Sequence, residues 1–179
     1  MSEAVELTIR EAVPADAAEL LKTTRQIGQE TEFLVMDEKG INLPEELLAI
    51  QLEDIYESPN NTLFVALLGD KIVGTASLKG ASEKRIAHIA ELGISILKDY
   101  WGMGLGSILM EELIDWAEAT NMIYRIKLTV QEQNTAAIHL YKKFGFEQEA
   151  VMARGARGDD GRFLNVLLMS KMIHEIEEN

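Results

Sequence analysis

The chain has 179 residues, a formal net charge of −13 and no cysteine. The lack of cysteine excludes disulfides, thiolate metal sites and a cysteine nucleophile. The negative charge disfavours binding to nucleic acid, because phosphates would be repelled. We expect one cytoplasmic domain over residues 1–179, because the length suits one full core, the acidic start lacks a secretory segment and no apolar run could cross a membrane.

The first third of the chain predicts one strand and two helices. Alternating apolar residues predict a strand over residues 5–10. Proline fits the first turn of a helix, so Pro14 and Pro44 open two helical patterns, the second of which ends before Ser58. We interpret residues 30–43, between these helices, as a connecting loop.

The rest of the chain predicts strands and helices separated by short turns. Glycines at residues 69, 145, 158 and 161 mark these turns. The polar tail, residues 174–179, is expected to fray. The whole order is that of an α+β chain with a central mixed sheet. The predicted strands are 62–68, 71–78, 86–97, 123–130, 146–153 and 163–172, and the predicted helices are 108–119 and 135–144.

A glycine-rich stretch, YWGMGLGS at residues 100–107, joins a predicted strand to a predicted helix. Glycines expose backbone N–H groups and the helix dipole favours negative charge, so the stretch predicts a phosphate-binding loop. A P-loop would carry Lys and then Ser or Thr after its last glycine, whereas Gly106 is followed by Ser107 and Ile108. A dinucleotide site would need another glycine spacing and a βαβ unit. A pyrophosphate loop for an acyl-coenzyme A needs only backbone donors, and a helix start without a ligand is the remaining alternative.

Two segments resemble signatures of the GCN5-related N-acetyltransferase (GNAT) family. ISILKDYWGMGLG at residues 94–106 resembles its motif A, and NTAAIHLYKKFGF at residues 134–146 resembles its signature N-x-x-A-x-x-x-Y-x-x-x-G-F. The order of the elements also fits the family over nearly the whole chain. The resemblance implies a mixed, mostly antiparallel central sheet flanked by helices, with strands 4 and 5 splayed apart to hold acetyl-CoA.

The resemblance also implies which residues hold this cosubstrate, and it implies no metal. The backbone of residues 94–96 would pair with the pantetheine arm like an added strand. The backbone amides of residues 102–107 would hold the pyrophosphate. The usual side-chain contact would be absent, because Trp101 stands where the family usually has Gln or Arg. The implied coenzyme-binding residues are Ile94, Ser95, Ile96, Trp101, Gly102, Met103, Gly104, Leu105, Gly106, Ser107, Asn134, Ala137 and Tyr141.

Acetyl transfer to an amine requires a base for the ammonium, a donor to the carbonyl oxygen and an acid for the leaving thiolate. The resemblance implies Tyr141 as the acid. Glu91 is the predicted base: its neighbours form an apolar run, an environment that suits a base near neutral pH, and phosphinothricin-type acetyltransferases have Glu at the matching place. His88 is a second candidate. Relatives that acetylate ribosomal protein N-termini have Glu where this chain has Thr129.

We therefore predict an acetyl-CoA-dependent N-acetyltransferase acting on a primary amine of a small molecule or a protein or peptide. The acceptor is expected between residues 30–43, 80–85 and 154–162, because loops on a rigid scaffold commonly set specificity. There Glu30, Glu32, Asp37 and Glu38 could bind a cation or be merely solvated. The alternatives are a non-catalytic acyl-CoA sensor and a nucleotide-binding module. We expect neither nucleic acid nor a membrane as partner, and exposed sheet edges would permit a homodimer.

Overall fold

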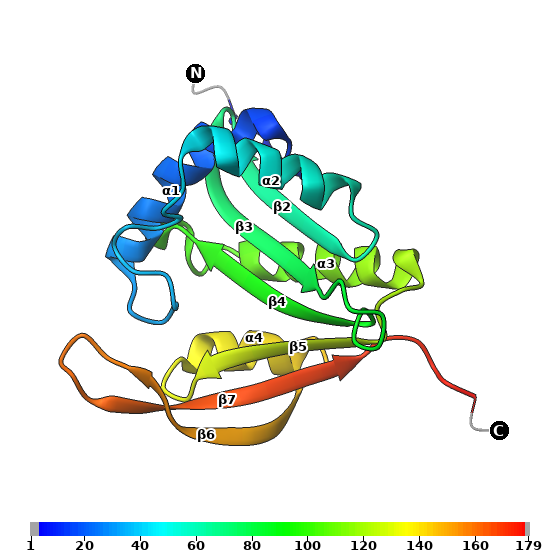
Figure 1. The fold of residues 1–179 in the computed structure, drawn as a ribbon. Helices are drawn as coiled ribbons and strands as arrows, with labels where there is room; N and C mark the ends of the chain where they lie inside the picture. Colours follow the sequence, from blue (N-terminus) through cyan, green and yellow to red (C-terminus); the bar gives the residue numbers. More distant parts are fainter. Residues whose placement is uncertain (1–3, 178–179) are drawn as a thin grey trace.

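The computed structural model describes residues 4–177 as a seven-stranded sheet with helices on both of its faces (Figure 1). Residues 1–3 and the end of the predicted tail, residues 178–179, lie outside this description. The strands are β1 (Leu7–Glu11), β2 (Asn61–Leu68), β3 (Lys71–Gly80), β4 (Ile89–Ile96), β5 (Arg125–Gln131), β6 (Glu147–Arg157) and β7 (Phe163–Met172). The helices are α1 (Ala17–Glu30), α2 (Glu45–Glu57), α3 (Leu105–Thr120) and α4 (Thr135–Lys143), with 3₁₀ turns η1 (Pro14–Asp16) and η2 (Lys98–Tyr100).

In space the strands follow the order β1-β2-β3-β4-β5-β7-β6. All neighbouring pairs among the described strands are antiparallel except β4 and β5, which are parallel. Helices α1 and α2 cover one face of the sheet, and α3 and α4 lie on the other (Figure 1). The predicted α+β class and mixed, mostly antiparallel sheet are therefore confirmed.

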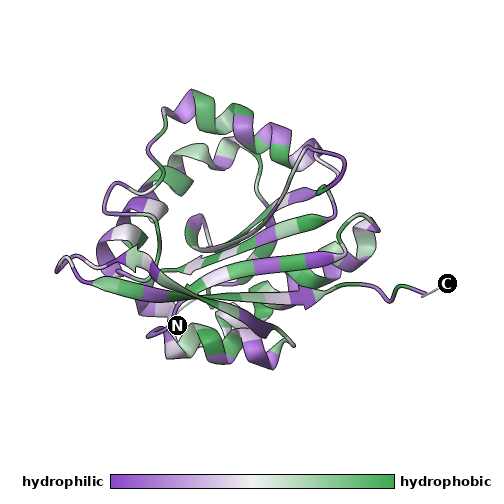
Figure 2. Cartoon of the chain, turned by 60° about the horizontal axis from the view of Figure 1, so that its bottom comes forward, coloured by the Kyte–Doolittle hydropathy of each residue, from purple (hydrophilic) through white to green (hydrophobic). Residues whose placement is uncertain are grey.

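An apolar core lies on each face of the sheet. Leu109 and Leu113 of α3 pack with Leu128 of β5 in the larger core. Leu20 of α1 and Leu52 of α2 pack with β2 and β3 in the smaller one. Figure 2 shows the hydrophobic residues within the strands and helices, and hydrophilic residues in several of the turns at the edges. Burial of these side chains holds the helices to the sheet, and with them the elements of the site.

Three predicted boundaries are wrong by three or four residues, each for a local reason. Helix α3 begins three residues before residue 108, because Gly104 adopts the left-handed conformation and starts the helix there. Strand β4 begins at Ile89 and not at residue 86, since turn hydrogen bonds occupy residues 83–89. Strand β6 runs past residue 153 to Arg157, and a Cβ on its Gly155 would lie 2.6 Å from Val166, so only glycine permits this close pairing.

The segment between α1 and α2 is held against α1 by close backbone approaches. A Cβ on Gly28 would lie 1.8 Å from the carbonyl oxygen of Asp37. Gly40 has a φ of +63°, and a Cβ there would lie 2.4 Å from the backbone nitrogen of Arg25. The N–H of Ile41 donates to Oγ1 of Thr24 at 3.2 Å. This segment is therefore a fixed wall beside the sheet and not only a connection.

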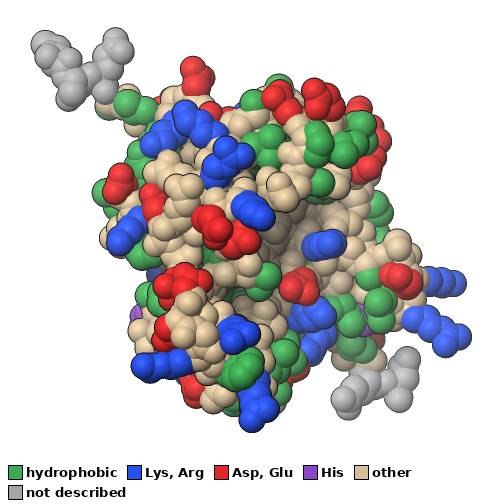
Figure 3. All heavy atoms as spheres, turned by 60° about the vertical axis from the view of Figure 1, so that its left-hand side comes forward, with side chains coloured by type: hydrophobic (Ala, Val, Ile, Leu, Met, Phe, Trp, Pro, Cys, Tyr) green, Lys and Arg blue, Asp and Glu red, His purple; other side chains and the backbone are tan. Residues whose placement is uncertain are grey.

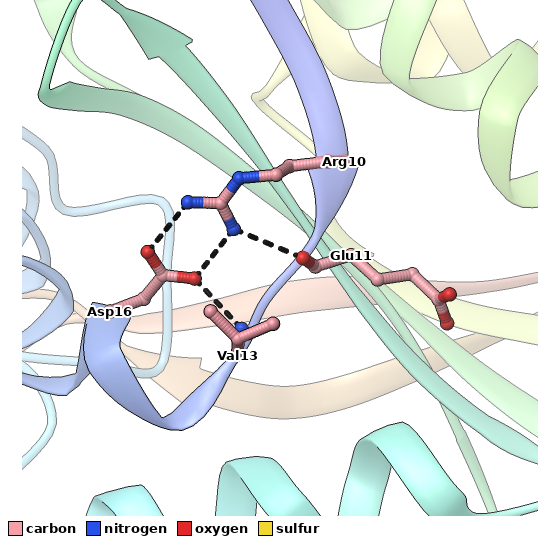
Figure 4. A network of polar contacts seen from close by, with 4 residues as sticks. All are labelled: Arg10, Glu11, Val13 and Asp16. Carbon is pink, nitrogen blue, oxygen red and sulfur yellow. Dashed lines mark hydrogen bonds and ion pairs between the residues drawn. The ribbon is translucent and has the colours of Figure 1, made fainter.

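Arg10 and Asp16 tie β1 to η1 through a two-armed ion pair (Figure 4). The two guanidinium nitrogens lie 2.8 and 2.9 Å from the two carboxylate oxygens. Asp16 also accepts a hydrogen bond of 2.8 Å from the N–H of Val13. Burial alone would raise the pKa of Asp16, but the hydrogen bonds from Arg10 and Val13 outweigh it, and the pKa lies below its ordinary value.

Candidate active site

Strands β4 and β5 separate after a short parallel contact, as predicted. They pair only from Ile89 to Glu91 on β4 and from Arg125 to Lys127 on β5. Both strands continue beyond this contact, β4 to Ile96 and β5 to Gln131. Figure 1 shows the two ribbons close at one end and diverging toward the other. A cavity of about 320 Å³ lies at this divergence.

Most of the residues predicted to bind the coenzyme surround this cavity: Ile94, Ser95, Ile96, Trp101, Gly102, Gly104, Leu105, Gly106, Asn134, Ala137 and Tyr141. Met103 and Ser107 do not. The Met103 side chain is 70% exposed to solvent, and Oγ of Ser107 accepts a hydrogen bond of 3.2 Å from Nζ of Lys143. These two residues therefore lie outside the wall of the cavity.

The backbone of β4 alternates between β3 and the cavity. The N–H of Leu97 donates to the carbonyl of Val73 in β3 at 2.9 Å. Because successive residues of a strand point their backbone groups to opposite sides, Ser95 also faces β3, whereas Ile94 and Ile96 face the cavity. The prediction that all three residues offer backbone groups to a ligand is therefore wrong for Ser95. Ile94 and Ile96 form an open strand edge.

The glycine stretch forms an open cradle at the start of α3. Gly102 and Gly104 have φ values of +74° and +81°, and a Cβ on either would meet no atom within 4 Å. Helix α3 has neither a side-chain cap nor an acidic residue in its first turn. Its first N–H groups are thus free for an anion, which the dipole also favours. This cradle fits a pyrophosphate held by backbone alone.

Gly106 allows helix α3 to pack closely against helix α4. A Cβ on Gly106 would lie 3.1 Å from Cδ2 of Leu140 in α4. The missing side chain therefore lets the first turn of α3 approach α4 across the cavity. Leu140 also lines the cavity, a position that its place in the sequence did not predict.

Helix α4 brings Asn134 and Tyr141 to the cavity. Oδ1 of Asn134 accepts a hydrogen bond of 3.3 Å from the N–H of Ala137, so Asn134 caps the helix. Tyr141 lies two turns further on, is 9% exposed and packs against the ring of Phe146. Burial raises the pKa of Tyr141 to about 12. Its hydroxyl therefore keeps its proton at neutral pH and can donate it into the cavity.

Glu91 lies outside the cavity. Its side chain is 56% exposed, with Oε2 3.9 Å from Nζ of Lys127. The apolar surroundings predicted for it are wrong, because Ala90 and Leu92 are buried on one face of β4 and Glu91 points to the other. On that other face, Thr129 follows Lys127 along β5. Glu91 thus shares a sheet face with Thr129, which does line the cavity.

The predicted second base, His88, is exposed. Its backbone carbonyl accepts hydrogen bonds from the N–H groups of Tyr124 and Arg125 at 2.9 and 3.2 Å. These bonds join the start of β5 to the turn before β4. His88 lines neither this cavity nor the one beside it.

A second cavity of about 380 Å³ adjoins the first. Both are lined by Thr31, Phe33 and Leu34 from the segment after α1, and by Thr129 and Val130 of β5. Part of the β6–β7 hairpin closes the second cavity, as predicted for the acceptor region, but residues 80–85 do not border it. Figure 3 views the molecule from the side of this segment and hairpin, and shows a hollow with acidic and basic side chains around it.

Carboxylates dominate the charge of the second cavity. Glu32, Asp37 and Glu38 of the segment and Asp159 of the hairpin line it, together with one cationic side chain, Arg157 of β6. A hydrogen bond with Asp159 raises the pKa of Glu32, and the charge of Asp159 adds to this effect. Glu32 and Asp159 therefore lie close to each other in the lining of the cavity. A cationic ligand would relieve their repulsion.

One further contact fixes a wall of the second cavity, and Glu30 makes a different one. Nε2 of Gln131 donates to the backbone carbonyl of Glu32 at 2.9 Å, and Gln131 is only 7% exposed. Glu30, predicted among the cation-binding acids, instead accepts hydrogen bonds of 2.8 Å from the N–H of Lys98 and from Nε2 of Gln26. Glu30 thus joins α1 to the loop before α3 and does not line the second cavity.

Within residues 4–177, no group of three or more His, Cys, Asp and Glu side chains is placed to hold a metal ion. None of the helices in this part of the chain is long and apolar enough to span a membrane.

The open strand edge, the anion cradle and the buried Tyr141 surround one cavity. Residues 29–146 match the Acetyltransferase (GNAT) family. The chain belongs to this family, and the predicted enzyme class, N-acetyltransferase, is confirmed.

Known proteins agree with this assignment. The L-amino acid N-acetyltransferase AaaT of Escherichia coli K12 is 29% identical over 120 residues, which are 67% of this chain and 74% of that protein. A GNAT-family acetyltransferase of Streptococcus pneumoniae is 45% identical, with a TM-score of 0.92 over 94% of this chain and 100% of that chain. The fold also matches yncA of Salmonella typhimurium, solved with acetyl-CoA, at 22% identity and a TM-score of 0.82 over 96% of each chain. Acetyl-CoA as cosubstrate is thus confirmed at the level of the family.

Proposed function

We propose that this protein transfers the acetyl group of acetyl-CoA directly to a primary amine. One observation carries the proposal: the open edge of β4, the uncapped start of α3 and the hydroxyl-bearing Tyr141 surround the same cavity. A strand edge suits the amides of a pantetheine arm, and the helix start suits a pyrophosphate. A nucleotide has no pantetheine arm that could pair with the strand edge, so this edge favours an acyl-CoA over a nucleotide as the ligand.

Each part of the cavity has one task in holding the coenzyme. Ile94 and Ile96 offer backbone groups to the pantetheine arm. The backbone N–H groups of residues 102–107 hold the pyrophosphate. Acetyl-CoA supplies the activated acetyl thioester when it is bound.

Tyr141 acts as the acid in the transfer. As the amine nitrogen forms its bond to the acetyl carbon and the carbon–sulfur bond breaks, the Tyr141 hydroxyl donates its proton to the leaving sulfur. A backbone N–H of β4 polarises the carbonyl oxygen. Glu91 takes the proton of the acceptor ammonium through intervening water, because its side chain is exposed and lies outside the cavity.

The acceptor occupies the second cavity. This cavity adjoins the first, and its carboxylates attract an ammonium group. A small amine or the N-terminus of a peptide fits an opening between a loop and a hairpin. The related AaaT is named for L-amino acids, so free amino acids belong in any acceptor screen.

The proposal is tested by release of free thiol from acetyl-CoA with a panel of amines: L-amino acids, linear polyamines and short peptides with a free N-terminus. N-acetylated versions of the same compounds are the matched controls. We expect release with at least one free amine and none with its acetylated control. Coenzyme binding without amine-dependent release over the whole panel would instead favour the non-catalytic acyl-CoA sensor.

A further inference from the structure

Trp101 makes a specific contact with the open edge of β4. Its indole Nε1 donates a hydrogen bond of 2.8 Å to the backbone carbonyl of Ile96, five residues earlier. The backbone of Trp101 is extended, and its N–H donates to the carbonyl of Lys98 at 3.1 Å. The side chain is thus folded back from the end of η2 onto the strand.

This contact changes what the strand edge offers a ligand. Ile94 and Ile96 face the cavity, so the edge consists of two N–H groups and two carbonyls. The indole N–H already donates a hydrogen bond to the carbonyl of Ile96. A strand-like ligand therefore meets both groups of Ile94 and the N–H of Ile96, but a carbonyl of Ile96 that already accepts one hydrogen bond.

The indole ring also forms part of the cavity wall. Trp101 lines the cavity, and the residue is 45% exposed. Its only polar atom is already bonded, so the rest of the ring presents an apolar surface. Large aromatic surfaces in a cavity wall bind apolar ligand segments, and a bonded indole N–H keeps the ring from rotating away.

We infer that Trp101 is a positioning residue for the pantetheine arm of the coenzyme. Its indole N–H occupies one acceptor position of the Ile96 carbonyl, and its ring contacts the arm next to the cradle. The backbone at residues 102–107 holds the phosphates independently of this ring. The inference rests on the coenzyme site of the proposed function.

Fluorescence of the native side chain tests the contact. The chain has two tryptophans, and Trp116 packs against the core, so Trp116→Phe leaves Trp101 as the reporter. We expect coenzyme A and pantetheine to change its emission, and adenosine 3′,5′-bisphosphate, which lacks the arm, to leave it unchanged. An equal change with the bisphosphate would overturn the inference, as would an unchanged emission while calorimetry reports bound coenzyme A.

Affinity measurements give a second, independent readout. We expect Trp101→Ala to raise the Kd of coenzyme A about tenfold, the order of one lost aromatic contact and hydrogen bond, and to leave the Kd of adenosine 3′,5′-bisphosphate within about twofold. Tyr56→Ala removes an exposed aromatic side chain from α2 and is the matched control. Equal weakening of both ligands by Trp101→Ala would overturn the inference.

The two proposals fail differently. If the wild-type protein binds no coenzyme A in calorimetry, the proposed function fails. If it binds coenzyme A with an affinity that Trp101→Ala does not change, only the role of Trp101 fails. Circular dichroism of each variant checks folding, and the fluorescence experiment does not depend on replacing Trp101.

Discussion

Glu91 and Lys127 face each other at the last paired position of β4 and β5, with Oε2 and Nζ 3.9 Å apart. Beyond this pair the strands separate and the cavity begins. Glu91 therefore lies next to the point where the two strands diverge, and its side chain is exposed to solvent. It lies on the same face of the sheet as Thr129, which lines the cavity. This position suits a base that removes a proton from the acceptor amine through an intervening water molecule.

Glu91→Gln should lower turnover most at neutral pH. At high pH the free amine loses its proton without help, so the ratio of wild-type to variant turnover should shrink toward one. The measurement is the pH dependence of turnover with saturating acetyl-CoA. Glu118→Gln, on the exposed side of α3, is the control and should match the wild type. Parallel profiles for Glu91→Gln and the wild type would remove Glu91 as the base.

Tyr141→Phe should lower turnover roughly 100-fold, the usual order for a lost general acid. The phenyl ring keeps the packing against Phe146, so the Kd of coenzyme A should stay within about twofold. Because burial raises the pKa of Tyr141 to about 12, wild-type turnover should show no loss from its ionisation between pH 7 and about 10. Full turnover in Tyr141→Phe would show that another group protonates the thiolate.

Gly104→Ala should weaken coenzyme binding. Gly104 has a φ of +81°, a conformation that costs an L-residue about 1–2 kcal/mol, so the cradle should distort. Gly69→Ala, in the β2–β3 turn at a φ of +59°, carries similar strain at a residue that does not line the cavity. Both variants should lose thermal stability, but only Gly104→Ala should raise the Kd of coenzyme A. An unchanged Kd in Gly104→Ala would contradict the cradle.

The parts of the site that depend on spacing along one element could be predicted from the sequence. Asn134 and Tyr141 lie seven residues apart, two helical turns, so both reach the same cavity. The start of α3 was predicted too late, since glycine is a poor helix residue by propensity. At Gly104 the left-handed start of the helix overrides that propensity.

The parts that depend on contacts between distant segments could not be predicted. Thr31 and Phe33 line both cavities, but their segment has no periodic pattern. Its position depends on the backbone contacts at Gly28 and Gly40, which no local rule reveals. For Glu91 the signal was present, since strict alternation along β4 places it opposite its apolar neighbours.

The ion pair between Arg10 and Asp16 should make the free energy of unfolding depend on pH in the acidic range. The pKa of Asp16 is lowered in the folded protein from its ordinary value of 3.8, so its contribution is complete above that value and is lost as the pH falls through the folded pKa. Asp16→Asn should lower the free energy of unfolding at pH 7 by about 2 kcal/mol, the scale of hydrogen bonds to charged groups. Urea unfolding at pH 7, 5 and 3 measures the difference from the wild type.

That difference should shrink at pH 3 relative to pH 7, because pH 3 lies below the ordinary pKa of 3.8, so Asp16 takes up a proton when the wild type unfolds. Hydrogen bonds from Arg125 and Ser170 lower the pKa of Glu149 to about 2. Glu149 therefore also loses its contribution to stability in acid. It is present in both proteins, so its effect cancels in the comparison. A difference that stays constant from pH 7 to pH 3 would mean that the loss in Asp16→Asn comes from altered packing of η1 and not from the charge of the pair.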